Sequence, residues 1–456
     1  MQTIEADYLV VGAGAMGMAF VDTVIGESEA TVVVVDRNDQ PGGHWLTAYP
    51  FVRLHQPSAY YGVNSRPLGN DTIDVGGWNE GFYELAGASE ICAYYDAVMR
   101  HRLLPTGRVS YFPMSEYLGD TRFRTLAGED YRVEVGRSIV DATYLNVVVP
   151  SMRPPLYEVA PGVDCIPPNE LPKRAAHDRY VIVGAGKTAF DSCLWLLRRG
   201  IGPDRLTWVR PRESWLMDRA AIQPGPAFAP HVIADFVAQM KASVKAETVA
   251  DLFDRLAASG CLLRIDDDAE PTMYRCAIVS KNELAQLKRI EDVIRLGHVT
   301  ALEPGRITLD GGKVDTDPSA LYVDCTGDGL GKRPAVDVFA PDRITLQPVR
   351  SCQPAFSAAV IGHVEVTKSA ATKNSYCRPV PHPTEPLDWL RMTVAFNDNQ
   401  LRWFDDAEML AWLDGARLNV VSHLSTGTTP TPQDMVPLGE RLRYVNERLA
   451  ALLARA

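Results

Sequence analysis

Two glycine-rich turns, widely separated in the chain, are the parts of this sequence whose residue types and spacing could bind a charged ligand. The first turn follows an apolar run and reads Gly12-Ala13-Gly14-Ala15-Met16-Gly17. In such a turn Gly12 allows a sharp bend, Gly14 lets the backbone approach a pyrophosphate, and Gly17 lets the next helix pack against the strand. The pyrophosphate would lie at the N-terminus of that helix, where free N–H groups favour an anion.

An acid follows the first turn at the spacing expected for a ribose contact. Asp36 stands about 20 residues after the glycines, directly behind a second apolar run at 31–35. A carboxylate there can accept hydrogen bonds from both hydroxyls of an adenosine ribose and would repel a 2′-phosphate. Arg37 comes next and is included with the binding residues. The order of strand, glycine turn, helix, strand and acid predicts an adenine dinucleotide site, whereas the glycines alone would also fit a purely structural turn.

The second turn repeats this arrangement with a different composition. After an apolar run at 181–183 the chain reads Gly184-Ala185-Gly186-Lys187-Thr188-Ala189. Ala189 replaces the third glycine, a change that the dinucleotide fingerprint allows. Lys187 adds a cation near the expected position of a pyrophosphate.

The two turns are followed by opposite charges. The strand after the second turn ends in Arg210-Pro211-Arg212, at the place where the first ends in Asp36. Guanidinium groups suit a bidentate contact with a 2′-phosphate. The sequence therefore predicts FAD at the first turn and NADPH at the second. A solvated basic loop is the alternative for Arg210 and Arg212.

Length and composition predict a folded protein of two or three domains. The chain has 456 residues, of which 46% are hydrophobic and 23% charged. The net charge of −11 argues against nucleic-acid or anionic-membrane partners, which require basic surfaces. We expect no membrane span, because no long apolar run occurs, and no metal cluster, because the eight cysteines are scattered. We predict reduced, mostly buried thiols in a cytoplasmic protein, with Cys352 serving in packing rather than redox chemistry.

The segment after Asp36 resembles a known family. The element Gly42-Gly43-His44-Trp45 and the run Arg53-Leu54-His55-Gln56-Pro57 are similar to those of flavin-containing monooxygenases and their Baeyer–Villiger relatives. The resemblance implies that Gly43, His44, Trp45, His55 and Gln56 line the isoalloxazine ring. It also implies that the backbone of a strand at 108–112 holds the adenine edge, which indicates Val109.

His55 is the one catalytic candidate. In the family an Asn often stands two residues before this proline, beside the flavin, and His55 takes its place. A histidine can donate a hydrogen bond as Asn can, and it also titrates near neutral pH. The same residue type fits a histidine that is merely hydrogen-bonded in a polar loop, so both interpretations stay open.

The remaining elements must position these residues. We expect a proline-rich linker at 150–172 and an Asp-x-x-Thr-Gly-like element that ends in Thr326-Gly327 and leads back to the FAD domain. The other predicted elements are helices at 89–101, 230–259 and from 356, strands at 131–149 and 343–349, and a hairpin at 297–317 with its turn at 310–312.

The predicted fold is α/β, with two Rossmann-like three-layer dinucleotide-binding domains and a helical cap. A glutathione-reductase-like FAD domain would comprise residues 1–160 and 322–456, the latter with a C-terminal helical region. The inserted NAD(P) domain would comprise residues 173–321, with a helical insertion at about 228–260.

The resemblance implies an FAD-dependent, NADPH-using monooxygenase that acts on a small molecule and molecular oxygen. Its mechanism would be hydride transfer to FAD, capture of oxygen at the flavin and oxygen transfer with NADP still bound. Two elements of the family are absent, a Phe-x-Gly-x-x-x-His signature and an Ala-Thr-Gly linker. Their absence favours the alternative of a flavin dehydrogenase or reductase that does not use oxygen. A third alternative is a flavin-fold binding protein without catalysis, against which the intact glycines argue.

Overall fold

The apolar run before the first glycine turn forms strand β1 (Gln2–Val11), which lies inside a seven-stranded sheet in the computed structural model. The structure describes residues 1–145, 147–327, 329–331, 333–422 and 430–456. The strand order is β3-β2-β1-β6-β5-β4, and β19 also pairs with β6. Parallel to β1 run β2 (Val32–Val35), β3 (Val109–Phe112), β6 (Asp130–Asp141) and β19 (Arg343–Thr345). An antiparallel extension is formed by β4 (Ser115–Gly119) and β5 (Arg122–Thr125).

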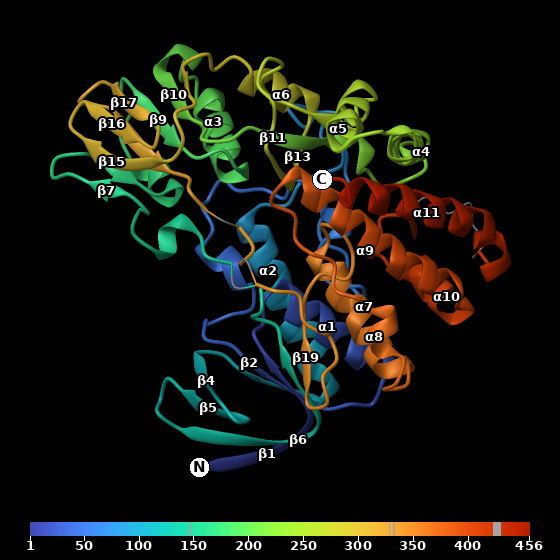
Figure 1. Ribbon diagram of the computed structural model, residues 1–456. Helices are drawn as coiled ribbons and strands as arrows, with labels where there is room; N and C mark the ends of the chain where they lie inside the picture. The colour runs from blue at the N-terminus through green and yellow to red at the C-terminus, as the bar shows by residue number, and fades with distance from the viewer. Residues whose placement is uncertain (146, 328, 332, 423–429) are drawn as a thin grey trace.

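Helices from both ends of the chain cover this first sheet. α1 (Ala15–Glu27) and α7 (Pro354–Thr367) pack together, and α2 (Ala88–Val98) lies nearby (Figure 1). α1 and α7 are buried along most of their length, which explains why they are apolar on all faces. The N-terminal and C-terminal parts of the chain therefore share one core.

The second sheet is built around β9 (Tyr180–Val183), the apolar run before the second turn. Its order is β14-β10-β9-β18-β8, with every pair parallel. The other strands are β8 (Cys165–Ile166), β10 (Leu206–Val209), β14 (Val293–Ile294) and β18 (Leu321–Asp324), and α3 (Lys187–Arg198) and α6 (Lys281–Leu287) accompany them. The segment predicted to lead back to the first domain thus begins as a strand of the second sheet.

The predicted proline-rich linker also contributes strands. β7 (Glu158–Val159) joins a small sheet of order β17-β16-β15-β7, and β8 joins the second sheet. The remaining strands of the small sheet are β15 (Val299–Glu303), β16 (Arg306–Leu309) and β17 (Gly312–Asp315). Residues 150–172 are therefore not only a linker, because two strands of two residues each form between the prolines. The predicted hairpin is a three-stranded meander that includes the expected turn after β16.

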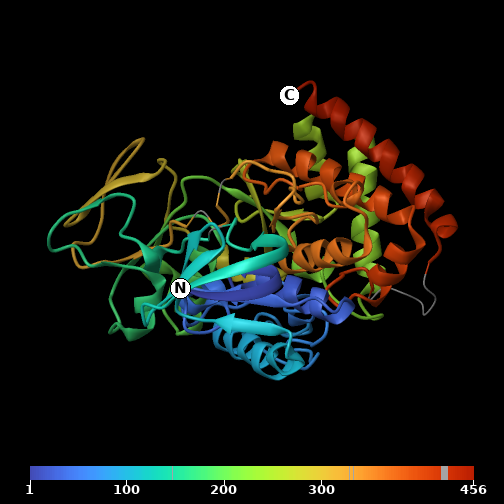
Figure 2. The same cartoon turned by 90° about the horizontal axis from the view of Figure 1, so that it is seen from below.

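The predicted helical segment near 230–259 forms α4 (Ala229–Lys245) and α5 (Val249–Ala258). These helices share a buried cluster with α9 (Pro386–Phe404) and α11 (Pro432–Leu453). A three-stranded sheet of β12 (Leu262–Leu263), β11 (Ser214–Asp218) and β13 (Met273–Val279) borders this helical layer. Figure 2 shows the C-terminal helices and the β15 to β17 strands on opposite sides of the molecule. The chain has the mixed α/β class that the sequence predicts.

Candidate functional site

The first glycine turn has a backbone that other residues would not readily adopt. Gly12 has a φ of +105°, and its N–H group donates to the carbonyl oxygen of Val35 over 2.8 Å. A Cβ on Gly17 would lie 2.0 Å from the carbonyl oxygen of Gly12. Only glycine at position 17 lets α1 begin this close to the end of β1.

The N-terminus of α1 offers free backbone donors. Gly14 is its N-cap residue, no side chain caps this end, and the first turn contains no acid. The N–H groups of Ala15 and Met16 follow Gly14, and the loop at 42–43 lies alongside. A Cβ on Gly43 would lie 2.9 Å from the Cα of Gly14, so this close approach requires glycine at position 43.

Asp36 organises the edge of the first sheet beside this turn. Its carboxylate accepts hydrogen bonds from the Ala13 N–H group over 2.5 Å and from the backbone and side-chain N–H groups of Asn38 over 2.8 Å each. Each carboxylate oxygen has two acceptor sites, and Oδ1 accepts both hydrogen bonds from Asn38. One site therefore remains, on Oδ2, for a ribose hydroxyl. Arg37 is exposed next to it.

Val109 does not lie where the resemblance implies. It pairs with Val32 at the beginning of β2, whereas Asp36 follows the other end of that strand. The backbone beside Asp36 belongs instead to residues 112–115. The Asp36 N–H group donates to the Phe112 carbonyl over 3.0 Å, and the Ser115 N–H group donates to the Asp36 carbonyl over 2.9 Å. Which residue of β3 lies beside Asp36 depends on the register of its pairing with β2, and the sequence alone does not give that register.

The second turn repeats the geometry of the first. Gly184 has a φ of +133°, and its N–H group donates to the Val209 carbonyl over 3.0 Å. Gly186 is the N-cap residue of α3, without a capping side chain, and a Cβ built on it meets nothing within 4 Å. Thr188 is half-buried in the first turn of the helix, and Ala189 is fully buried.

Each turn packs against the chain that follows a neighbouring strand. A Cβ on Gly12 would lie 3.2 Å from Cγ2 of Thr143, and one on Gly184 would lie 2.7 Å from the Cys325 carbonyl oxygen. Thr326 donates to the Asp324 carboxylate, and the Gly327 N–H group donates to the Cys325 carbonyl. The predicted Thr326-Gly327 element therefore lies behind the second turn.

The equivalent element of the first turn is Asp141-Ala142-Thr143, which was not predicted from the sequence. Asp141 ends β6 as Asp324 ends β18, and both aspartates accept a hydrogen bond from the threonine two residues later. The shared Asp-x-Thr pattern was the available signal. Tyr144 stands where the family's Ala-Thr-Gly linker would have glycine.

Arg210 does not fit the predicted phosphate contact. Its side chain is 3% exposed, lies 3.2 Å from the Glu213 carboxylate and stacks over the Trp208 ring at 4.7 Å. Glu213 also pairs with Arg295 over 2.7 Å, so the charge of Arg210 is only partly balanced, but the buried guanidinium is enclosed and not open to a phosphate. Arg212 is half-buried, and among the described residues no side chain pairs with its guanidinium.

Lys187 is paired within its own helix, α3, instead of lying free. It forms an ion pair with Asp191, and the Tyr49 hydroxyl donates to the same carboxylate over 2.7 Å. Burial raises the pKa of Asp191, an effect that Lys187 opposes. Phe51, near Tyr49 in sequence, stacks on Trp195 of α3 at 5.1 Å. The loop after the first turn thus contacts the helix of the second.

His55 lies beside β13 and is neutral at physiological pH. The Ile278 N–H group donates to its Nδ1 atom over 3.1 Å, so the ring proton belongs on Nε2. Burial, with the nearby cations Lys187 and Arg219, lowers the pKa of His55 to about 3. The expectation that it titrates near neutral pH is wrong, because burial and like charges both disfavour the protonated ring.

The other residues that the resemblance implies, His44, Trp45 and Gln56, belong to the same segment of the chain as His55. Burial lowers the pKa of His44 to about 4, and its ring lies 4.9 Å from that of Trp45. The Trp45 indole N–H group donates to the Tyr61 hydroxyl over 2.7 Å. Gln56 is half-buried beside His55.

Arg219 holds the His55 loop and was not identified from the sequence. The side chain is fully buried, and its guanidinium donates to the His55 carbonyl, to Asn79 over 2.9 Å and to Glu283 over 2.7 Å. Although burial alone would raise the pKa of Glu283, Arg219 and Lys187 hold it below its usual value. A single arginine after a strand carries no motif, so only the tertiary structure reveals this role.

The prediction of reduced cysteines is wrong at one pair. Cys276 and Cys352 form a disulfide with a Cα–Cα distance of 6.1 Å. They are 76 residues apart and show no motif spacing, so the pairing depends on the approach of β13 to the turn before α7. The other six cysteines are free thiols.

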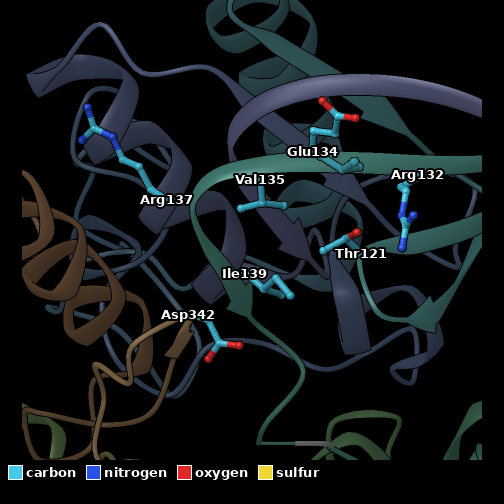
Figure 3. A pocket seen from close by; sticks show the side chains of 8 residues that line it. Thr121, Arg132, Glu134, Val135, Arg137, Ile139 and Asp342 are labelled. Atoms are coloured by element: carbon cyan, nitrogen blue, oxygen red, sulfur yellow. The ribbon is translucent and has the colours of Figure 1, made fainter.

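The described residues contain neither a helix long and apolar enough to cross a membrane nor a group of ligating side chains suited to a metal ion. One surface hollow lies on the first sheet, away from both turns (Figure 3). It is lined by residues of β6 and by Thr121 and Asp342.

Comparison with known proteins identifies relatives of this chain. No family model matches it. It is 58% identical to the uncharacterized protein Rv2000 of Mycobacterium tuberculosis H37Rv, across 99% of this chain and 85% of that protein, and equally similar to the uncharacterized protein Mb2023 of Mycobacterium bovis.

Solved structures show weaker likenesses. Cyclohexanone monooxygenase from Rhodococcus sp. Phi1 bound to NADP+ is 15% identical, with a TM-score of 0.47 over 100% of this chain and 98% of that one. A flavin-containing monooxygenase from Stenotrophomonas maltophilia is 14% identical, with a TM-score of 0.41 over 77% and 89%. Likenesses this weak establish neither fold nor function. The identity of 58% over nearly the whole length shows that this chain belongs to the same family as the two mycobacterial proteins.

Proposed function

We propose that the protein is an FAD-dependent oxidoreductase that takes electrons from NADPH and acts as a monooxygenase on a small molecule. The observation that carries this proposal is the pair of glycine turns with matching geometry and different charges behind them. Asp36 follows the first turn, and the half-buried Arg212 lies behind the second. Two such turns facing a shared loop suit two dinucleotides that must exchange electrons.

The residues of the first turn fit the diphosphate and ribose of FAD. The uncapped N-terminus of α1 can donate to phosphate oxygens, and Gly14 leaves room for their approach. Asp36 can accept from the ribose, and the backbone at 112–115 lies where an adenine edge could bind. When bound, FAD would supply the hydride acceptor that passes electrons to oxygen.

The residues of the second turn fit NADPH. The uncapped N-terminus of α3 is a phosphate site, and the space at Gly186 allows close approach. Arg212 would contact the 2′-phosphate in place of Arg210. Lys187, held by Asp191, would contribute positive charge near the pyrophosphate.

His55 would orient the reacting groups as a neutral hydrogen-bond donor. Its Nδ1 atom is occupied by the Ile278 N–H group, which leaves the Nε2–H group to donate. With a pKa of about 3 it supplies no proton at neutral pH. The contact of Phe51 with Trp195 would help to exclude water where the two sheets meet.

A dehydrogenase or reductase that does not use oxygen is the second candidate. The absence of the Phe-x-Gly-x-x-x-His signature favours it. It shares both cofactor sites with the leading proposal and differs in the fate of the electrons.

Isotopically labelled oxygen gas separates the two candidates. The protein is loaded with FAD, supplied with NADPH and given a panel of ketones and sulfides. A monooxygenase transfers one labelled oxygen atom to the product for each NADPH consumed. Product without label, formed only with an organic electron acceptor, would establish the dehydrogenase. Failure to bind FAD at all would refute both candidates.

A further inference from the structure

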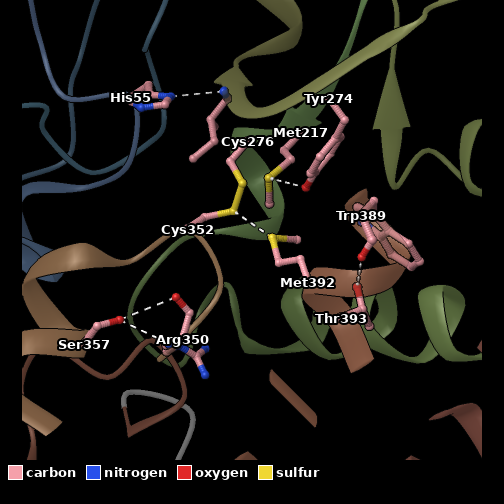
Figure 4. The surroundings of a disulfide bond; sticks show 11 residues. His55, Met217, Tyr274, Cys276, Arg350, Cys352, Ser357, Trp389, Met392 and Thr393 are labelled. Atoms are coloured by element: carbon pink, nitrogen blue, oxygen red, sulfur yellow. Dashed lines mark hydrogen bonds between the residues drawn. A yellow bond between two sulfur atoms is a disulfide. The ribbon is translucent and has the colours of Figure 1, made fainter. Parts of the chain in front are cut away.

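The disulfide links two parts of the chain that meet near His55. Cys276 lies in β13, and Cys352 lies two residues before α7 begins (Figure 4). The bond therefore joins the three-stranded sheet of β11, β12 and β13 to the start of α7, the helix that packs against α1. None of the secondary structure requires such a link, since the sheet and the helix have their own hydrogen bonds.

Both cysteines have an unusual backbone conformation. Their φ angles are +54° and +58°, in the left-handed region that disfavours residues with a Cβ. The four other described residues of this kind that are not glycine lie outside strands, whereas Cys276 lies within one. Between Trp215 and Met217 of β11 the pairing with β13 shifts register, so the strand bulges at Cys276. Backbone of this kind is concentrated at functional positions.

The strand next to the bulge also contacts His55, the candidate catalytic residue. The Ile278 N–H group that donates to His55 stands two residues after Cys276. On the other side of the bond, Arg350 donates to Gln353 over 2.6 Å within the turn that contains Cys352. Figure 4 shows His55, the disulfide and Arg350 in one neighbourhood. A change at the bond would therefore be transmitted to the loop of His55.

We propose that Cys276–Cys352 is a redox-active disulfide that dithiol reductants open, and that its opening loosens β13 and the contact with His55. The inference does not depend on the proposed cofactors. Cys352 is partly exposed and Cys276 is 6% exposed, so a thiolate attacks the sulfur of Cys352 and Cys276 leaves as a thiolate that takes up a proton. The second thiol of the reductant then displaces Cys352. The protein gains two thiols, and the reductant leaves as its own disulfide.

The remaining partly exposed cysteines are less suited to this chemistry. Cys165 and Cys92 have no cysteine partner. Burial raises the pKa of Cys165 to about 11 and raises that of Cys92 as well, which suppresses their thiolates. Exchange with a dithiol should therefore be confined to one pair.

The test equilibrates the folded full-length protein with set ratios of reduced to oxidised dithiothreitol. Samples are acid-quenched, unfolded, alkylated and mapped by mass spectrometry. We expect six alkylated cysteines in the oxidised protein and eight in the reduced protein, with the change confined to Cys276 and Cys352. Circular dichroism should show that the protein stays folded. Two free thiols at these positions under oxidising buffer, or reduction only on global unfolding, would overturn the proposal.

Hydrogen exchange tests the link to His55. Peptides that contain Ile278 should exchange at least about tenfold faster after reduction, while those of β9 stay unchanged. Joint replacement by Cys276→Ser and Cys352→Ser should give the fast exchange with or without reductant. The matched Cys165→Ser variant should keep the response. Equal exchange of Ile278 in oxidised and reduced wild type would contradict the transmission to His55.

Discussion

The two glycine turns share their geometry and differ in what their surroundings leave available. In both, the first glycine has a positive φ and donates to the end of the next strand, and the helix N-terminus is uncapped. Behind the first turn, Asp36 holds the loop and keeps acceptor capacity. Behind the second, the buried Arg210 side chain pairs with Glu213 and stacks on the Trp208 ring. The two proposed phosphate sites thus share their backbone geometry, and the pairing of the charged side chains is what would decide which phosphate ester each selects.

The third glycine position of each turn is Gly17 in the first and Ala189 in the second. Changes at these two residues should have the largest effect on stability. Gly17→Ala places a Cβ 2.0 Å from the Gly12 carbonyl, so α1 must move away from the strand. We expect a loss of about 3 kcal/mol or more in the free energy of unfolding, measured with urea. Ala189→Gly, the mirror change in the second turn, should cost about 1 kcal/mol. Equal losses would show that the two turns do not differ in helix packing.

The acid behind the first turn gives the next largest effect. Asp36→Asn removes the charge that would bind a ribose hydroxyl, and a hydrogen bond to a charged group contributes about 2 kcal/mol. FAD affinity, titrated by flavin fluorescence, should fall about thirtyfold. The exposed neighbour provides the control, since Asp39→Asn should leave the affinity unchanged. Undiminished binding by Asp36→Asn would remove the ribose contact from the account.

The basic loop behind the second turn separates its two arginines. Arg212→Ala should lower the preference for NADPH over NADH about tenfold, because a charge-assisted contact with the 2′-phosphate is lost. Arg210→Ala should preserve that preference and lower the unfolding midpoint, since it exposes the packing of Trp208 and Glu213. Dissociation constants for both nucleotides decide the matter. The reverse result would return the phosphate contact to Arg210.

At neutral pH the smallest effect concerns His55, because its contribution to stability changes only under acidic conditions. The pKa of His55 is about 3 in the folded protein and about 6.5 when unfolded, so between these values the unfolded state binds the extra proton. The contribution of this group to stability is full above pH 6.5 and falls as the pH drops towards 3, by up to about 1.4 kcal/mol per pH unit. His55→Asn should flatten that dependence in urea titrations. The exposed control His101→Asn should not, and a matching change there would contradict the assignment.

Local features could be predicted from the sequence. The apolar runs, both glycine turns and the helical segment of α4 and α5 follow from periodicity and backbone preference within short windows. Features that depend on contacts between distant segments could not. The register of β3 places residues 112–115 and not Val109 beside Asp36, and the contacts of Arg219 and the pairing of Cys276 with Cys352 also depend on the folded chain. The sequence shows a positive charge at Arg210, but only the folded structure shows that this side chain is buried against Glu213.

The central claim is that the first turn binds FAD and the second binds NADPH, and crossed glycine variants test it most directly. The measurement is cofactor content and NADPH affinity for the wild type, Gly14→Val and Gly186→Val. The wild type should purify with FAD, which acid releases intact. Gly14→Val should lose FAD and still bind NADPH, whereas Gly186→Val should keep FAD and lose NADPH, because each side chain blocks one pyrophosphate. A wild type that neither contains nor takes up FAD, or variants that leave both affinities unchanged, would contradict the account.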